Sequence, residues 1–268
     1  MSEKFETGWA VITGASSGLG AIFAERLAKR GMPLVLAGRD ADRLEQVRRR
    51  VYERAPGVGV ELVVGDLGTR HGVDELVAAL GDREIGVLVN NAGFGTYGLV
   101  AETDAQRDHE LVAVNVDALV RLTHAVLPSM VARGRGGIIN VASAIAFQPA
   151  PYQATYGASK AFVLSFSQAL SAETKGTGVR VTALCPGPTR TGFVDALGAD
   201  VSSVAVYKRL DEPGPVVDAG LRAFDRGQAV VVPGLRTRLM ALASKYSPSS
   251  ISTAVSERML RPAAAVAS

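Results

Sequence analysis

A tyrosine and a lysine one helical turn apart are the residues of this chain best suited to move a proton. Lys160 follows Tyr156 by four residues within a stretch, 153–174, whose apolar spacing predicts a helix, so both side chains should share one face. A phenol has an ordinary pKa of about 10, and a neighbouring ammonium favours its ionised form. The pair therefore predicts a tyrosine whose pKa is lowered toward the range where proton transfer is effective.

A serine and an asparagine could complete the same site. Ser143 follows a predicted strand at 137–141, at the carboxyl edge where open α/β sheets bind ligands, so its hydroxyl could hold a substrate oxygen. Asn115 precedes a predicted helical stretch at 116–131 and could hold a water that passes protons to Lys160. Taken singly, these side chains also have structural interpretations: a half-buried aromatic, a solvated lysine and two helix caps. Their combination favours catalysis.

A glycine-rich turn lies between the first predicted strand, 9–13, and a predicted helix, 19–30. Glycines there let backbone N–H groups and the positive helix N-terminus approach a pyrophosphate without clashes with Cβ atoms. The spacing Gly-x-x-x-Gly-x-Gly differs from the generic Gly-x-Gly-x-x-Gly, and a tight turn without a ligand is the alternative. After the first strand of an α/β chain, the turn predicts a dinucleotide site at these residues: Gly14, Ser16, Ser17, Gly18, Leu19 and Gly20.

The end of the second predicted strand bears on the choice of dinucleotide. Enzymes that take NAD usually carry an acid there for the ribose hydroxyls, and neither Ala37 nor Gly38 is acidic. Arg39 follows at once, and a guanidinium can bind a 2′-phosphate through two charge-assisted hydrogen bonds. NADP(H) is therefore preferred. NAD(H) remains open, because Arg39 could merely solvate the strand end beside Asp40, and Asp40 could serve the ribose.

Short apolar, β-branched runs alternate along the chain with stretches of helical spacing. Mostly unalternated strands are buried on both faces, and their alternation with helices implies a parallel sheet with right-handed crossovers. We therefore predict an α/β fold with a doubly wound, parallel seven-stranded sheet between two helical layers, a three-layer Rossmann fold. The predicted strands are 9–13, 33–37, 60–64, 87–90, 137–141, 179–184 and 229–232, and the predicted helices include 19–30, 42–54, 69–80, 116–131 and 153–174.

One catalytic domain is expected over residues 1–234, because no linker or change of composition divides them. The segment at about 187–215 is rich in Gly and Pro and is predicted to be a lid, since long ordered loops are usually functional. Residues 235–268 form a predicted C-terminal helical extension, broken at Ser247-Pro248. Its apolar strip with basic neighbours could touch an anionic membrane surface, but packing on the lid or on another subunit is the preferred interpretation.

The composition excludes several classes of protein. The 268 residues carry a formal net charge of only +3, which does not indicate nucleic-acid binding. A single cysteine, Cys185, cannot form an internal disulfide, and the charged opening lacks the apolar stretch of a signal peptide, so we expect a cytoplasmic protein. The apolar runs are too short to span a bilayer. The three histidines, His71, His109 and His124, are scattered, and we predict no metal site.

These motifs together resemble those of the short-chain dehydrogenase/reductases, over nearly the whole chain up to about Gly234. In that resemblance Asn115, Ser143, Tyr156 and Lys160 correspond to the catalytic tetrad. It implies an NADP-preferring reductase that interconverts carbonyl and alcohol by hydride transfer, with Tyr156 as general acid/base and Lys160 also binding the nicotinamide ribose. It further implies cofactor contacts at Asp66 and Leu67, at Asn91, Ala92 and Gly93, and at Pro186, Gly187 and Thr189.

The substrate side is predicted from residues that follow the fourth and fifth strands and from the lid. They are mostly apolar, which favours a hydrophobic ketone, aldehyde or 3-oxoacyl substrate, whereas Arg190 would suit an acidic or acyl-thioester group. We expect a small-molecule substrate and a homodimer or homotetramer. The alternatives are a non-catalytic NADP-binding regulator, or an epimerase or dehydratase on the same fold. The predicted pocket residues are Phe94, Ala144, Phe147, Phe193 and Leu197.

Overall fold

The seven predicted strands form one parallel sheet in a computed structural model that describes residues 7–262. The strand order is β3-β2-β1-β4-β5-β6-β7, so the chain winds outward in both directions from the neighbouring pair β1 and β4. This confirms the doubly wound Rossmann fold. The strands are β1 (Trp9–Thr13), β2 (Leu34–Gly38), β3 (Val60–Val64), β4 (Ile85–Asn90), β5 (Gly136–Val141), β6 (Val179–Leu184) and β7 (Val230–Val231).

Helices cover both faces of the sheet and create two hydrophobic cores. Along β1, Ala10 and Ile12 pack into the core that contains Phe23, whereas Val11 points to the opposite core, which contains Leu122. Successive side chains of a strand thus enter opposite cores, and because both cores are apolar, the strand sequence is an unbroken apolar run. One layer holds α1 (Gly18–Ala28), α2 (Ala41–Arg54) and α7 (Pro213–Asp225); the other holds α3 (Arg70–Leu80), α4 (Ala105–Val112), α5 (Leu119–Arg133) and α6 (Ala154–Glu173).

The helix predicted at 116–131 starts eleven residues earlier than expected. Asp104 caps α4 by accepting a hydrogen bond from the Gln106 backbone, and α4 continues through a π-helical turn, Ala113–Ala118, into α5. The first turns of α4 are polar, and the π turn breaks the spacing of 3.6 residues on which the prediction relied. Asn115 therefore lies inside a continuous helix and is not a cap.

The stretch from Ala105 to Arg133 is long and apolar enough to cross a membrane by length and composition alone. Buried core helices meet the same criterion, so this is weak evidence for a span. Here the helix packs on the central strands, with Leu111, Leu122 and Met130 buried.

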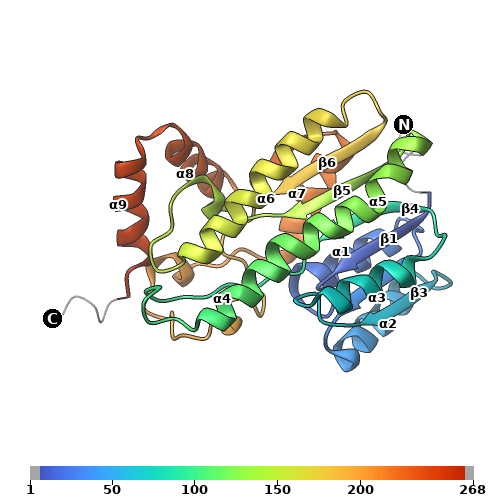
Figure 1. Cartoon of the computed structure of the whole chain (residues 1–268), viewed down its shortest axis with the longest axis horizontal. Coiled ribbons are helices and arrows are strands. Elements are labelled where there is room, and N and C mark those ends of the chain that lie inside the picture. The colour runs from blue at the N-terminus through green and yellow to red at the C-terminus, as the bar shows by residue number, and fades with distance from the viewer. Residues whose placement is uncertain (1–6, 263–268) are drawn as a thin grey trace.

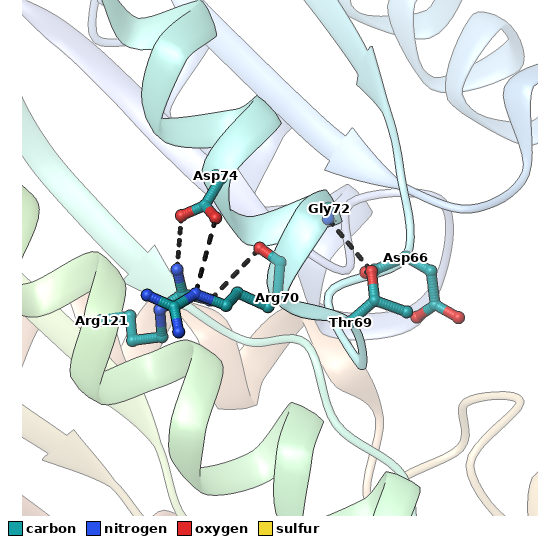
Figure 2. Close-up of polar contacts among 6 residues, drawn as sticks. All are labelled: Asp66, Thr69, Arg70, Gly72, Asp74 and Arg121. Atoms are coloured by element: carbon teal, nitrogen blue, oxygen red, sulfur yellow. Dashed lines mark hydrogen bonds and ion pairs between the residues drawn. The ribbon is translucent and has the colours of Figure 1, made fainter.

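Arginines on α2 and α5 form ion pairs with a neighbouring helix of the same layer. Arg50 and Arg54 of α2 both pair with Glu25 of α1, which is only 3% exposed, so these two arginines connect α2 to α1. In the other layer, Figure 2 shows Arg121 of α5 reaching Asp74 and the Arg70 carbonyl of α3. These contacts fix the N-terminal end of α3 next to the sheet edge.

The lid and the last two helices lie together at one end of the molecule, apart from α1, α2 and α3 (Figure 1). The segment 187–215, which is predicted to be a lid and is called the lid below, contains two short 3-10 turns, Asp195–Leu197 and Ala205–Lys208, and its last three residues belong to α7. The extension forms α8 (Leu235–Tyr246) and α9 (Ser249–Leu260), and its residues 263–268 lie outside the described part.

Most of the apolar strip of α8 does not pack on the lid, and packing on another subunit, the other part of the preferred interpretation, stays a prediction. The exposed fractions of Leu235, Leu239 and Leu242 are 74%, 58% and 43%. The helix instead packs its Ala241 and Ser244 side toward the turn that follows β5, where Ala241 is 5% exposed and Ser244 bonds to Gln148.

Candidate active site

A cavity of about 1600 Å³ opens along the carboxyl edge of the sheet. Residues within two positions of the ends of six strands line it: Gly14, Arg39, Gly65, Asn91, Ala142 and Pro186. The loops that follow β1 and β4 run to opposite sides of the sheet, because the winding direction changes between these two strands. Doubly wound sheets bind their ligands in the crevice that this leaves. The opposite wall comes from the lid, α8 and α9.

The glycine turn after β1 has the backbone shape that a phosphate site needs. Gly14 and Gly18 have positive φ values of 62° and 55°, and a Cβ on Gly14 would lie 2.9 Å from the Ala92 Cα. Helix α1 begins at Gly18 with no side-chain cap from Ser17, so its first N–H groups are left for a ligand. Of the predicted turn residues, Gly14, Ser16, Ser17, Gly18 and Leu19 line the cavity.

Gly20 does not line the cavity and has a packing role instead. A Cβ there would lie 2.3 Å from the Gly14 carbonyl oxygen and 2.6 Å from Asn91 Nδ2. Only glycine therefore lets α1 approach the end of β1 so closely.

Hydrogen bonds tie the ends of β1 and β4 beneath this turn. Asn91 Nδ2 donates to the carbonyls of Thr13 and Gly14 at 2.9 and 3.2 Å, and Thr13 Oγ1 accepts from the backbone N–H groups of Asn91 and Ala92. The predicted motif Asn91, Ala92 and Gly93 thus steadies the sheet and also lines the cavity.

Asp66 and Leu67 line the cavity at the end of β3. Asp66 Oδ1 accepts from the Gly68 backbone at 2.9 Å, and Thr69 caps α3 by accepting from Gly72. In Figure 2 Asp66 lies on the far side of Thr69 from the Arg70, Asp74 and Arg121 contacts, so its carboxylate is not used by them.

Arg39 lines the cavity and makes no hydrogen bond or ion pair with any other described residue, 7–262. Its neighbour Asp40 caps α2 by accepting from the Arg43 backbone at 2.9 Å and pairs with the Arg43 side chain at 3.3 Å. Arg39 is thus a free cation at this end of the site, while Asp40 is occupied by its own helix.

Tyr156, Lys160 and Ser143 come together where α6 passes the end of β5. Tyr156 and Lys160 are 7% and 5% exposed, and Ser143 hydrogen-bonds to the Tyr156 phenol. Lys160 Nζ donates to the Val141 carbonyl at 2.9 Å and lies 5.9 Å from the centre of the Tyr156 ring. The shared face predicted from the four-residue spacing is present.

Asn115 joins the same site from the π turn. Its Oδ1 accepts from the Phe94 backbone at 3.1 Å, and its Nδ2 donates to the Phe94 carbonyl and to Ser159 Oγ, each at 3.0 Å. A Cβ on Gly93 would lie 2.8 Å from Asn115 Oδ1 and 3.3 Å from Lys160 Nζ, so this glycine lets both side chains approach β4. Asn115 does not itself line the cavity.

The substrate side agrees in part with the predicted pocket. Phe94, Ala144 and Phe193 line the cavity, whereas Phe147 and Leu197 do not. Phe147 packs into a cluster under α6, and Leu197 is buried within the apolar cluster of the lid.

Arg190 also lies away from the cavity, because it pairs with Glu212 at 2.9 Å. Pro186, Gly187 and Thr189 do line it.

Sequence reasoning missed several lining residues. Gln153 could have been found, because it precedes Tyr156 by one helical turn. The others come from the lid, α8 and α9, whose positions depend on tertiary packing: Val206, Tyr207, Ser244, Ser256, Met259 and Leu260.

Residues 8–202 match the family model described as short chain dehydrogenase. The chain belongs to the short-chain dehydrogenase/reductase family. Its relatives include an uncharacterized oxidoreductase from Staphylococcus saprophyticus, 36% identical over 85% of this chain and 96% of that one. A short-chain dehydrogenase from Sphingobium yanoikuyae in complex with NADPH is 39% identical over 88% of this chain and 92% of that one, with a TM-score of 0.80.

A second solved structure is the bulky-bulky ketone specific alcohol dehydrogenase from Comamonas testosteroni. It is 35% identical over 89% of this chain and 92% of that one, with a TM-score of 0.77. This short-chain dehydrogenase/reductase is thus an NAD(P)-dependent oxidoreductase of alcohol and carbonyl groups.

The pKa of Tyr156 is raised in this short-chain dehydrogenase/reductase, whereas the sequence predicted that it would be lowered. Burial raises the pKa of the phenol to about 12, and the hydrogen bond from Ser143 only partly opposes this. Burial also lowers the pKa of Lys160 to about 8, so the amine holds its charge less firmly than an exposed lysine. The sequence expectation considered the ammonium and left out the burial of both groups.

Cys185 lies beside these groups but has no sign of nucleophilic reactivity. The side chain is fully buried, and burial raises the pKa of its thiol to about 12 despite the Lys160 charge and a backbone hydrogen bond from Ser143. It acts as a small buried side chain under the site. Residues 7–262 contain no group of three or more His, Cys, Asp or Glu that could hold a metal ion.

Proposed function

We propose that this protein is an NADPH-dependent reductase of hydrophobic carbonyl compounds, with Tyr156 as the proton donor. The observation that carries the proposal is the Tyr156 phenol, hydrogen-bonded to Ser143 with Lys160 beside it. The other end of the same cavity holds Arg39, which has no partner among residues 7–262. One cavity would thus contain both the group that transfers a proton, Tyr156, and the group that recognises a 2′-phosphate, Arg39.

The residues present fit a bound dinucleotide. The positive φ of Gly14 and Gly18 and the uncapped start of α1 suit a pyrophosphate, and Arg39 suits the 2′-phosphate that distinguishes NADP from NAD. Lys160 would also contact the nicotinamide ribose. The bound cofactor supplies a hydride to the carbonyl carbon.

Tyr156 and Ser143 act on the carbonyl oxygen. The Ser143 hydroxyl positions that oxygen, and the phenol gives it a proton as the new C–H bond forms, so that the carbonyl becomes an alcohol. The high pKa of Tyr156 keeps the phenol protonated at neutral pH, which is the form that a proton donor needs. Asn115 would hold a water that returns protons through Lys160.

The substrate proposed is a bulky, uncharged ketone or aldehyde. Ile145, Phe193, Val206 and Met259 give that part of the cavity an apolar lining. The resemblance to the Comamonas enzyme, described as specific for bulky-bulky ketones, supports the same substrate class.

A 3-oxoacyl thioester is a second candidate, favoured by two arginines. Arg209 and Arg236 line the cavity and have no ion-pair partner among residues 7–262. They could bind phosphates of a thioester carrier. This candidate predicts a clearly lower KM for a coenzyme A thioester than for the same acyl group on N-acetylcysteamine, and equal KM values would eliminate it.

The test of the main proposal is a panel of aliphatic, aromatic and bulky ketones and aldehydes with NADPH or NADH. Turnover is followed by the absorbance of the nicotinamide. We expect reduction of bulky ketones with NADPH favoured over NADH. A protein that binds NADPH but reduces no member would contradict the proposal and favour a regulatory role.

A further inference from the structure

Gln148 stands between the catalytic serine and the last two helices. It ends the 3-10 turn Ala144–Phe147, which begins directly after Ser143, and its side chain lines the cavity. The Ser143 hydroxyl accepts from the Ile145 backbone at 3.3 Å, so the same short turn positions both residues. Gln148 therefore borders the space next to the reacting oxygen.

Ser244 of α8 holds the Gln148 side chain from the opposite wall. Its hydroxyl donates to Gln148 Oε1, and both residues are half-buried and line the cavity. Because α8 packs against the 3-10 turn, this contact joins the catalytic turn to the C-terminal helices. The glutamine is thus fixed in one orientation, which lowers the entropy cost of binding through it.

The amide nitrogen of Gln148 keeps its hydrogen-bonding capacity. A glutamine amide has two N–H donors, and Nε2 of Gln148 makes no hydrogen bond with any other residue in the described part of the chain. A fixed donor beside a largely apolar cavity is a common device for orienting a ligand.

Seven of the eight charged lining residues belong to other parts of the cavity, and the eighth, Arg209, lies in the lid. Arg39, Asp40, Arg43 and Asp66 follow β2 and β3, and Lys160 lies under Tyr156. Asp211 and Thr237 lie beside Gly187, which places Asp211 and Arg236 near the turn after β6. The polar side chains that the contacts place next to Gln148, Ser143 and Ser244, are uncharged, which fits a neutral oxygen rather than an anion.

We propose that Gln148, oriented by Ser244, determines specificity by donating a hydrogen bond to a second, uncharged oxygen of the substrate. This rests on the proposed function and narrows its substrate class to bulky ketones that carry a further carbonyl, hydroxyl or ether oxygen. Such a substrate contacts Ser143 and Tyr156 through the reacting carbonyl and Gln148 through the other oxygen.

The experiment compares diketones with monoketones of the same skeleton. The two pairs are benzil with deoxybenzoin, and dibenzoylethane with phenylbutyrophenone, which place the second oxygen at two distances. The quantity measured is the ratio of kcat/KM for diketone over monoketone, compared between variants so that intrinsic reactivity cancels. The variants are Gln148→Met, which keeps the length but removes the donor, and Ser244→Ala, which breaks the same contact but keeps the amide.

We expect Gln148→Met to lower the diketone-to-monoketone ratio about three- to tenfold for at least one pair, the effect of one neutral hydrogen bond. Ser244→Ala should lower it much less. Equal ratios in wild type and Gln148→Met for both pairs, or the same fall in both variants, would overturn the subsite while leaving the reductase function standing. No reduction of any ketone by the wild type would overturn the proposed function itself.

Discussion

The cofactor end of the cavity is built from strand ends and glycines, whereas the substrate end is built from a lid, a 3-10 turn and two C-terminal helices. At the cofactor end the backbone leaves no room: a Cβ on Gly14 or Gly20 would lie within 2.9 Å of another atom. At the substrate end a Cβ on Gly192 would meet nothing within 4 Å.

Close backbone packing tolerates few substitutions, and side-chain walls tolerate many. The comparison indicates that binding of a dinucleotide depends on the backbone of the fold, while substrate choice can be altered by single side chains.

The largest expected effect is at Tyr156, which stands between the two ends. Tyr156→Phe removes only the hydroxyl, so both ends keep their shape while proton donation is lost, and kcat should fall by about 10²- to 10⁴-fold. Steady-state reduction with NADPH measures the loss, and NADPH fluorescence titration should show unchanged affinity. Near wild-type kcat would remove Tyr156 from the mechanism.

A paired glycine experiment tests the contrast directly. Gly20→Ala should force α1 away from β1, lowering the free energy of unfolding by about 1–3 kcal/mol and weakening dinucleotide binding. Gly192→Ala in the lid should change neither. Thermal unfolding and NADPH titration measure both variants, and similar losses in the two would show that the ends do not differ in packing.

Arg39 tests how cofactor choice is set. Arg39→Asp should raise the KM for NADPH by about 10- to 100-fold, since it removes charge-assisted bonds to a 2′-phosphate, and change the KM for NADH much less. Steady-state kinetics with both cofactors measure this. Equal changes for the two would remove Arg39 from 2′-phosphate recognition.

The raised pKa of Tyr156 predicts different pH profiles for the two directions. Alcohol oxidation needs the phenolate, whose fraction below a pKa of about 12 grows about tenfold per pH unit, so oxidation should rise between about pH 7 and 10. Carbonyl reduction needs the phenol and should not follow that rise. Single-turnover rates in each direction measure it, and an oxidation rate that does not change over this range would contradict the prediction.

The smallest expected effect is at the substrate wall. Met259→Ala enlarges the cavity from α9, so the preference among ketones should shift toward larger ones by about threefold, with little change in unfolding temperature. Leu239→Ala, on the exposed side of α8, is the matched control and should change neither. A shift in both variants would mean that the C-terminal helices act through their overall position.

Local patterns predicted the central sheet well because a buried strand is a continuous apolar run. All seven strands start and end within two residues of their predicted bounds, and the glycine turn and the Tyr156–Lys160 face follow from spacing alone. The lining by α8 and α9 could not be predicted, since it depends on packing between segments far apart in sequence. The pKa of Tyr156 was missed for the same reason, because its burial comes from the lid and the sheet together.

The π turn that carries Asn115 has a consequence for insertions and deletions. It holds one residue more than an α-helical turn, so the wide turn absorbs the extra residue while α4 and α5 keep nearly the rotation of one continuous helix. Deleting one residue from Ala113–Ala118 would restore a regular α-helix and leave the flanking helices close to their present rotation. The wide turn that holds Asn115 against both Phe94 and Ser159 would be lost. A change in chain length at this turn would therefore disturb the site locally, with little effect on the helices on either side.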